Sequence, residues 1–83
     1  MKARRLIETS KFAPERLQIT LKAFDEAWGE IAGHFAGDEV ATEHAQMRLA
    51  DAVLIVASKD GNDVDRLKSE ALEAMALGYQ KRN

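Results

Sequence analysis

One stripe of large apolar side chains does most to constrain what this chain can fold into. Its members recur at intervals of three or four residues: Leu17, Leu21, Phe24, Trp28, Ile31 and Phe35. This spacing places all of them on one face of an α-helix, because the helix has about 3.6 residues per turn. The stripe therefore predicts one long amphipathic helix, with Trp28 anchored in the hydrophobic core.

The first predicted helix covers residues 14–35. Pro14 suits the first helical position, because its missing N–H group would be unpaired there in any case. Phe12 and Leu17 have the spacing of a hydrophobic staple, in which a residue just before the helix packs on its first turns. Glycines recur near the C-terminal end, and each weakens the helix, so it could end as early as Gly33.

Two further helices are predicted, over residues 38–58 and 63–80. Asp38 and either Asn62 or Asp63 can cap their N-termini, because their side-chain oxygens accept hydrogen bonds from the unpaired N–H groups there. A turn centred on Asp60-Gly61-Asn62 separates the two helices. Their predicted inward positions are Leu49, Val53 and Val56 in the first and Val64, Leu67, Ala71 and Met75 in the second.

Short connections between these helices favour antiparallel neighbours, so the expected fold is an all-α, compact three-helix bundle. The apolar run at residues 52–57 is also compatible with a buried strand, but the chain supplies no convincing partner strand. Residues 1–12 are polar and basic, without a hydrophobic period. They are expected to form a flexible N-terminal arm outside a single helical domain of residues 13–83.

Composition and spacing argue against several classes of site. The 83 residues contain no cysteine, which removes disulfides, thiol catalysis and thiolate zinc sites. The two histidines, His34 and His44, lie on different predicted helices without metal-ligand spacing. The turn at residues 60–65 lacks the glycine and the final glutamate of a calcium-binding loop. We therefore expect a protein that is not an enzyme and binds no cofactor or metal.

A basic cluster supports the main alternative function, a nucleic-acid-associated or regulatory accessory protein. The cluster consists of Lys2, Arg4, Arg5 and Lys11. Against this alternative, the net charge is −2, and the acidic start of the third predicted helix would repel phosphate. No stretch has the length and apolarity of a membrane span or a secretory signal, so a cytoplasmic protein without membrane contact is expected.

Surplus apolar surface predicts self-association. Met47, Leu54 and Ile55 lie beside the core stripe of the second predicted helix, and a three-helix bundle needs only one stripe per helix. Two copies related by a two-fold axis would bury the same patch on each chain. We therefore expect a homodimer that serves as a protein–protein interaction module, with an unknown protein partner. The open alternative is that the N-terminal arm folds back and covers the patch with Leu6 and Ile7.

Three amphipathic stretches resemble a group of small, uncharacterised all-helical proteins of α-proteobacteria. They are Ala-Phe-Asp-Glu-Ala-Trp at residues 23–28, Arg-Leu-Ala-Asp-Ala-Val-Leu at 48–54 and Asp-Arg-Leu-Lys-Ser-Glu-Ala-Leu at 65–72. The resemblance spans most of residues 12–76. It implies a compact helical fold and a cytoplasmic bacterial origin, and it supplies no activity and no functional residue.

Overall fold

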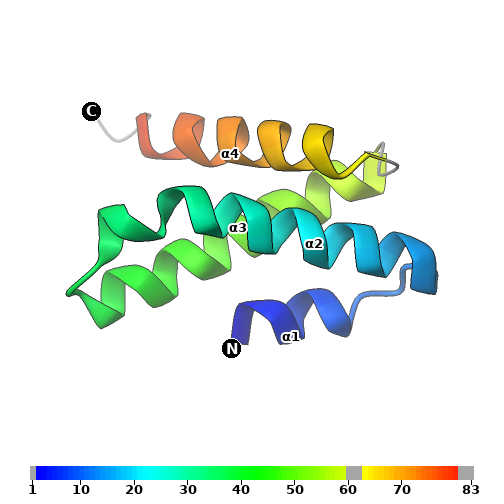
Figure 1. The fold of residues 1–83 in the computed structure, drawn as a ribbon, viewed down its shortest axis with the longest axis horizontal. Helices are drawn as coiled ribbons and strands as arrows, with labels where there is room; N and C mark the ends of the chain where they lie inside the picture. Colours follow the sequence, from blue (N-terminus) through cyan, green and yellow to red (C-terminus); the bar gives the residue numbers. More distant parts are fainter. Residues whose placement is uncertain (1, 60–62, 81–83) are drawn as a thin grey trace.

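The computed structural model describes residues 2–59 and 63–80, with side chains described up to residue 76. Four α-helices and one short 3-10 helix make up this part of the chain, and it contains no strand (Figure 1). In chain order they are α1 (Lys2–Glu8), α2 (Pro14–Ile31), η1 (Ala32–Phe35), α3 (Glu39–Lys59) and α4 (Val64–Gln80). The all-α prediction is confirmed. Residues 52–57 lie inside α3, so they do not form the buried strand with which their sequence is also compatible.

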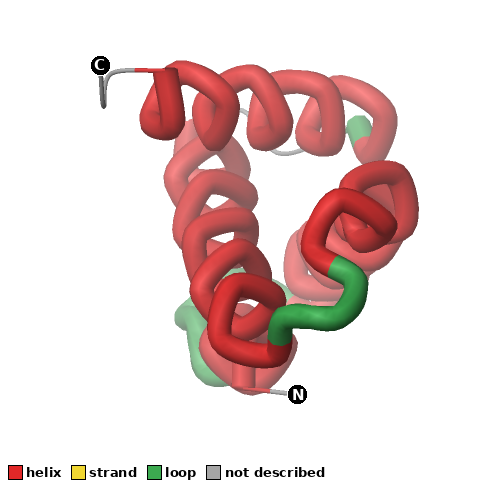
Figure 2. The backbone as a smooth tube through the Cα atoms, turned by 90° about the vertical axis from the view of Figure 1, so that its left-hand side faces the viewer, coloured by secondary structure: helices red, strands yellow, loops and turns green. Residues whose placement is uncertain are grey.

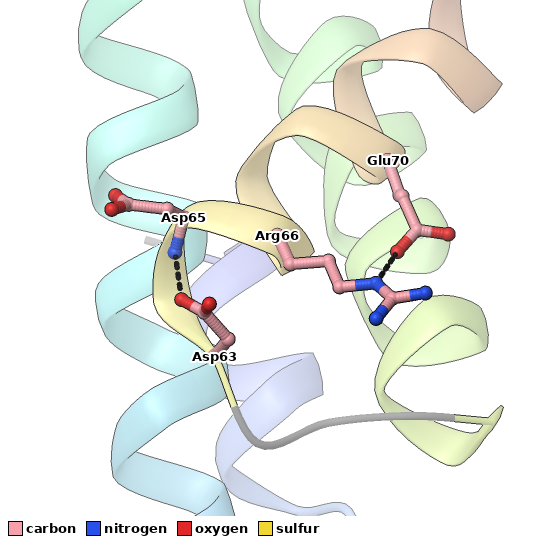
Figure 3. A network of polar contacts seen from close by, with 4 residues as sticks. All are labelled: Asp63, Asp65, Arg66 and Glu70. Carbon is pink, nitrogen blue, oxygen red and sulfur yellow. Dashed lines mark hydrogen bonds and ion pairs between the residues drawn. The ribbon is translucent and has the colours of Figure 1, made fainter.

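The predicted helix starts are confirmed by their backbone contacts. Pro14 is the first residue of α2, and Ala13 before it makes no side-chain capping bond. Asp38 caps α3, because its Oδ1 atom accepts a hydrogen bond from the Ala41 N–H at 3.0 Å. Asp63 caps α4 in the same way, and its Oδ1 atom accepts from the Asp65 N–H at 3.0 Å (Figure 3). The predicted turn at residues 60–62 lies outside the described residues.

Helix α2 ends in a glycine-containing segment, as expected from the weakening effect of glycine on a helix. Regular α-helix stops at Ile31, and the chain continues as η1 before it reverses into α3. Gly37 makes this reversal with φ of +92°, a conformation that costs a residue with a Cβ atom steric strain. The Thr42 hydroxyl then donates to the Phe35 carbonyl at 2.9 Å, which ties the end of η1 to the first turns of α3.

The buried face of α2 is offset from the predicted stripe of large residues. Phe24 is the one member of that stripe that is fully buried, whereas Trp28 is half-buried and stacks on Phe35 with ring centroids 5.8 Å apart. Ala23 and Ala27 are fully buried beside Phe24. Small side chains at the centre of the contact permit close approach of neighbouring helices, and the large side chains fill the space along its edge.

α3 is buried over a wide arc because it packs against three other helices, α1, α2 and α4. Its buried residues are Ala45, Leu49, Ala50, Ala52, Val53 and Ala57. α1 and α4 lie on opposite sides of the α2–α3 pair (Figures 1 and 2). Within the described ranges, no helix combines the length and apolarity needed to cross a membrane.

The N-terminal segment differs from the predicted flexible arm. Residues Lys2–Glu8 form α1, which packs against α2 and α3, so the described part of the chain holds four α-helices rather than three. Ala3 and Ile7 are 1% and 0% exposed. An isolated helix of this length is unstable in water. Burial of these two side chains on the α2–α3 pair therefore explains why the segment is helical here.

Candidate interaction surface

The three side chains of the predicted interface do not share one surface. Met47 and Leu54 are half-buried against the core, whereas Ile55 is 57% exposed. An ion pair of 3.5 Å between Lys2 and Glu43 places α1 beside the face of α3 that carries Glu43. Met47 and Leu54 lie four and eleven residues further on, which keeps them on that face. The side chains of Met47 and Leu54 therefore lie on the side of α3 that carries Glu43, and Ile55 lies on a different side.

Two ion pairs join α1 to the α2–α3 pair. The Arg4 guanidinium donates a hydrogen bond to the Asp25 carboxylate on α2, and the two form an ion pair. This hydrogen bond, and then the negative charge of Asp25, raise the pKa of Arg4 above its ordinary value. Lys2 pairs with Glu43 on α3. Two cations of the predicted basic cluster thus bind carboxylates of the same chain.

A shallow groove between α3 and α4 contains the exposed side chain of Ile55. The groove has a volume of about 270 Å³ and is lined by Arg48, Asp51, Ala52, Ile55, Ala74 and Met75. Arg48 and Asp51 are exposed and carry opposite charges beside Ile55. The groove therefore combines an apolar contact with both signs of charge, a composition typical of protein–protein contact surfaces.

A second groove, on the other flank of α4, is almost entirely apolar. It has a volume of about 220 Å³ and is lined by Ile31, His34, Phe35, Leu72, Met75 and Ala76. Nearby, the Lys68 ammonium group donates to the Glu30 carboxylate at 2.8 Å, a contact that joins α4 to α2. This hydrogen bond, together with the negative charge of Glu30, raises the pKa of Lys68. Met75 contributes to the floor of both grooves.

The start of α4 does not resemble a helix that reads nucleic acid. Asp63 and Asp65 are exposed there, and the Arg66 Nε atom donates to the Glu70 carboxylate at 2.9 Å (Figure 3). A recognition helix presents cationic or amide groups to base edges and phosphates. In α4 the first charged side chains are acidic, and Arg66 pairs with Glu70 of the same helix.

The two histidines are not brought together into a metal centre. His34 is exposed in η1, and His44 is exposed in α3. In residues 2–59 and 63–80, no three His, Asp or Glu side chains are grouped so that they could hold a metal ion.

We expect purified protein to contain no stoichiometric metal and to melt at the same temperature with and without a chelator. Metal analysis after mild purification and paired thermal melts check this. A structural metal contributes directly to folding free energy, so its removal would lower the melting temperature clearly. Stoichiometric zinc or iron would contradict the prediction and direct attention back to His34 and His44.

Comparisons with known proteins found no match for this chain. No protein-family model matches the chain. No curated protein matches it, and no solved structure matches it. The resemblance to helical α-proteobacterial proteins therefore stays a prediction from sequence.

Proposed function

We propose that this protein is a small, non-enzymatic interaction module that binds protein surfaces and associates with a second copy of itself. The observation that carries the proposal is the exposure of Ile55 at the groove between α3 and α4. In the described part of the chain, Val40 is the other large apolar residue with comparable exposure. Ile55 differs from Val40 in lying at a groove whose lining includes the exposed Ala74 and the buried Met75. Contiguous apolar surface of this kind marks contact sites.

The charges around Ile55 are arranged so that two copies would complement each other. His44, Arg48, Asp51 and Ile55 recur at intervals of four, three and four, which places them on one face of α3. When two such helices pair antiparallel about a two-fold axis, Arg48 of each copy meets Asp51 of the second copy. An isologous contact requires a self-complementary surface of this type. The proposed homodimer therefore places α3 at its two-fold axis.

Replacing Ile55 with glutamate should abolish this association. Ile55 is 57% exposed, so each of the two copies in a dimer has about half of the roughly 1.5–3 kcal/mol of full burial still to gain. Loss of both contributions should raise the dissociation constant roughly hundredfold. Light scattering over a concentration series measures the change. The matched control is Val40→Glu, which places the same charge on the same helix about 22 Å away, at a rise of about 1.5 Å per residue.

The wild type and Val40→Glu should both rise in mass towards a dimer, while Ile55→Glu stays monomeric. A wild type that remains monomeric at every accessible concentration would overturn the proposal. Equal loss of association in Val40→Glu and Ile55→Glu would show that the groove between α3 and α4 is not the contact.

A further inference from the structure

The apolar groove on the α2 side of α4, called the α2–α4 groove below, has the size of a site for one small molecule. Its lining comes from the end of α2, from η1 and from α4: Ile31, His34, Phe35, Leu72, Met75 and Ala76. Its volume is about 220 Å³. Apolar cavities of about 150 Å³ bind benzene, so the α2–α4 groove has room for one aromatic ring on a short arm.

An aromatic pair supports one wall of the α2–α4 groove. Phe35 lines the groove, and its ring stacks on that of Trp28 with an interplanar angle of 14°. Met75 contributes its thioether to the lining. Aromatic rings and methionine sulfur both make favourable contacts with a further ring. The lining therefore favours an aromatic ligand over a purely polar one.

The ion pair between Lys68 and Glu30 borders one end of this groove. Glu30 directly precedes Ile31 in α2, and Lys68 lies one turn before Leu72 in α4, so the pair joins the two helices that line the groove. The Glu30 side chain is 54% exposed, and its contact with Lys68 uses the Oε2 atom. Each oxygen of a carboxylate accepts hydrogen bonds, so Glu30 can pair with a second cation as well.

Carboxylates outnumber ammonium groups along the seam between α2 and α4. The hydrogen bond from Lys68 to Glu30, and then the negative charge of Glu30, raise the pKa of Lys68, and the charges of Glu26 and Asp65 raise it further. Three carboxylates thus act on one ammonium group. The seam therefore attracts a positively charged ligand and repels a negatively charged one.

We propose that the α2–α4 groove binds a small organic cation, in which an aromatic ring lies in the groove and an ammonium group on a short arm pairs with the Glu30 carboxylate. The apolar lining selects the ring, and the excess of carboxylates selects the sign of the charge. The proposal does not depend on self-association at Ile55, because the two grooves lie on different flanks of α4.

Three probes of similar shape and different charge test the proposal: phenethylamine, phenethyl alcohol and phenylacetate. Trp28 is the single tryptophan of the chain and stacks on Phe35, so its fluorescence reports on the groove. Titrations at low ionic strength and about pH 8 keep histidine side chains neutral and the amine protonated. The amine should bind saturably and up to about fivefold more tightly than the alcohol, and phenylacetate should bind most weakly.

Two variants separate the charge from the groove. Glu30→Gln should remove the preference for the amine over the alcohol. Ala76 is exposed at the groove, so Ala76→Phe should fill the groove with a ring of the chain itself and abolish binding of the probes. The matched control is Ala74→Phe, because Ala74 is also exposed on α4 but lines the groove at Ile55 instead. Binding of the amine should persist in that control.

Circular dichroism establishes that each variant retains the helix content of the wild type before its binding is compared. The proposal would be overturned by the absence of saturable amine binding to the wild type, or by equal affinities for the amine and the alcohol. Amine binding that survives Ala76→Phe would overturn it as well, because the cation would then bind outside the α2–α4 groove.

Discussion

Replacing Phe24 with alanine should remove most of the stability of the fold. Phe24 is fully buried and is the largest side chain at the centre of the core cluster. Its truncation deletes buried apolar surface and leaves a cavity, which together cost about 3–5 kcal/mol. Small domains have total stabilities of only about 5–15 kcal/mol, and a chain of this length lies near the lower end. Denaturant unfolding followed by circular dichroism measures the change.

Trp28→Ala is the matched control for Phe24→Ala, because it removes a larger aromatic residue from the next turn of the same helix. Trp28 is half-buried, so part of its surface is already in contact with water, and we expect a smaller loss of stability. Its stacking on Phe35 is the specific contact that would be lost. A larger destabilisation by Trp28→Ala than by Phe24→Ala would support the sequence-based placement of Trp28 as the core anchor.

Replacing Ile7 with aspartate should detach α1 while α2, α3 and α4 remain folded. Ile7 is fully buried, and Ala3 is the other buried side chain of this helix. Truncating a buried isoleucine alone costs about 2–5 kcal/mol, and the added carboxylate would have to be desolvated as well. The two exposed ion pairs of α1 cannot offset this loss. Hydrogen exchange should show full loss of protection for the amides of residues 6–9, which donate to carbonyls one turn earlier in α1.

The control for Ile7→Asp is Arg5→Asp, which introduces the same charge at an exposed position of α1. Protection of the amides of residues 6–9 should persist in that variant. Unchanged protection in Ile7→Asp would show that Ile7 does not hold α1 in place. Simultaneous loss of protection in α2 and α3 would show instead that α1 is part of the cooperative core.

Local signals in the sequence were enough to place three of the four described α-helices. Pro14 begins α2, and Asp38 and Asp63 cap α3 and α4 where the sequence predicts them. These signals work because a proline or a capping carboxylate acts on N–H groups only a few residues away. The glycines near residue 33 likewise indicated that α2 could end early, since glycine weakens a helix whatever the helix packs against.

The candidate interface could be predicted only in part. The apolar period of residues 38–58 shows that α3 carries more apolar surface than one contact needs, but not which part of it other helices cover. Met47 and Leu54 are half-buried against the core, and Ile55 stays exposed at the groove between α3 and α4. That difference depends on the directions from which α1 and α4 approach α3, and no local pattern specifies them.

Tertiary contacts also decided the state of the N-terminus and the orientation of α2. Seven residues lack the length to form a stable helix alone, so α1 exists through the burial of Ala3 and Ile7 on helices distant in sequence. For α2, the period identified an apolar face, but contact with several helices at once turned Ala23 and Ala27 inward and left Trp28 half-buried. Periodicity reports which side chains share a face, whereas close packing determines which of them are excluded from water.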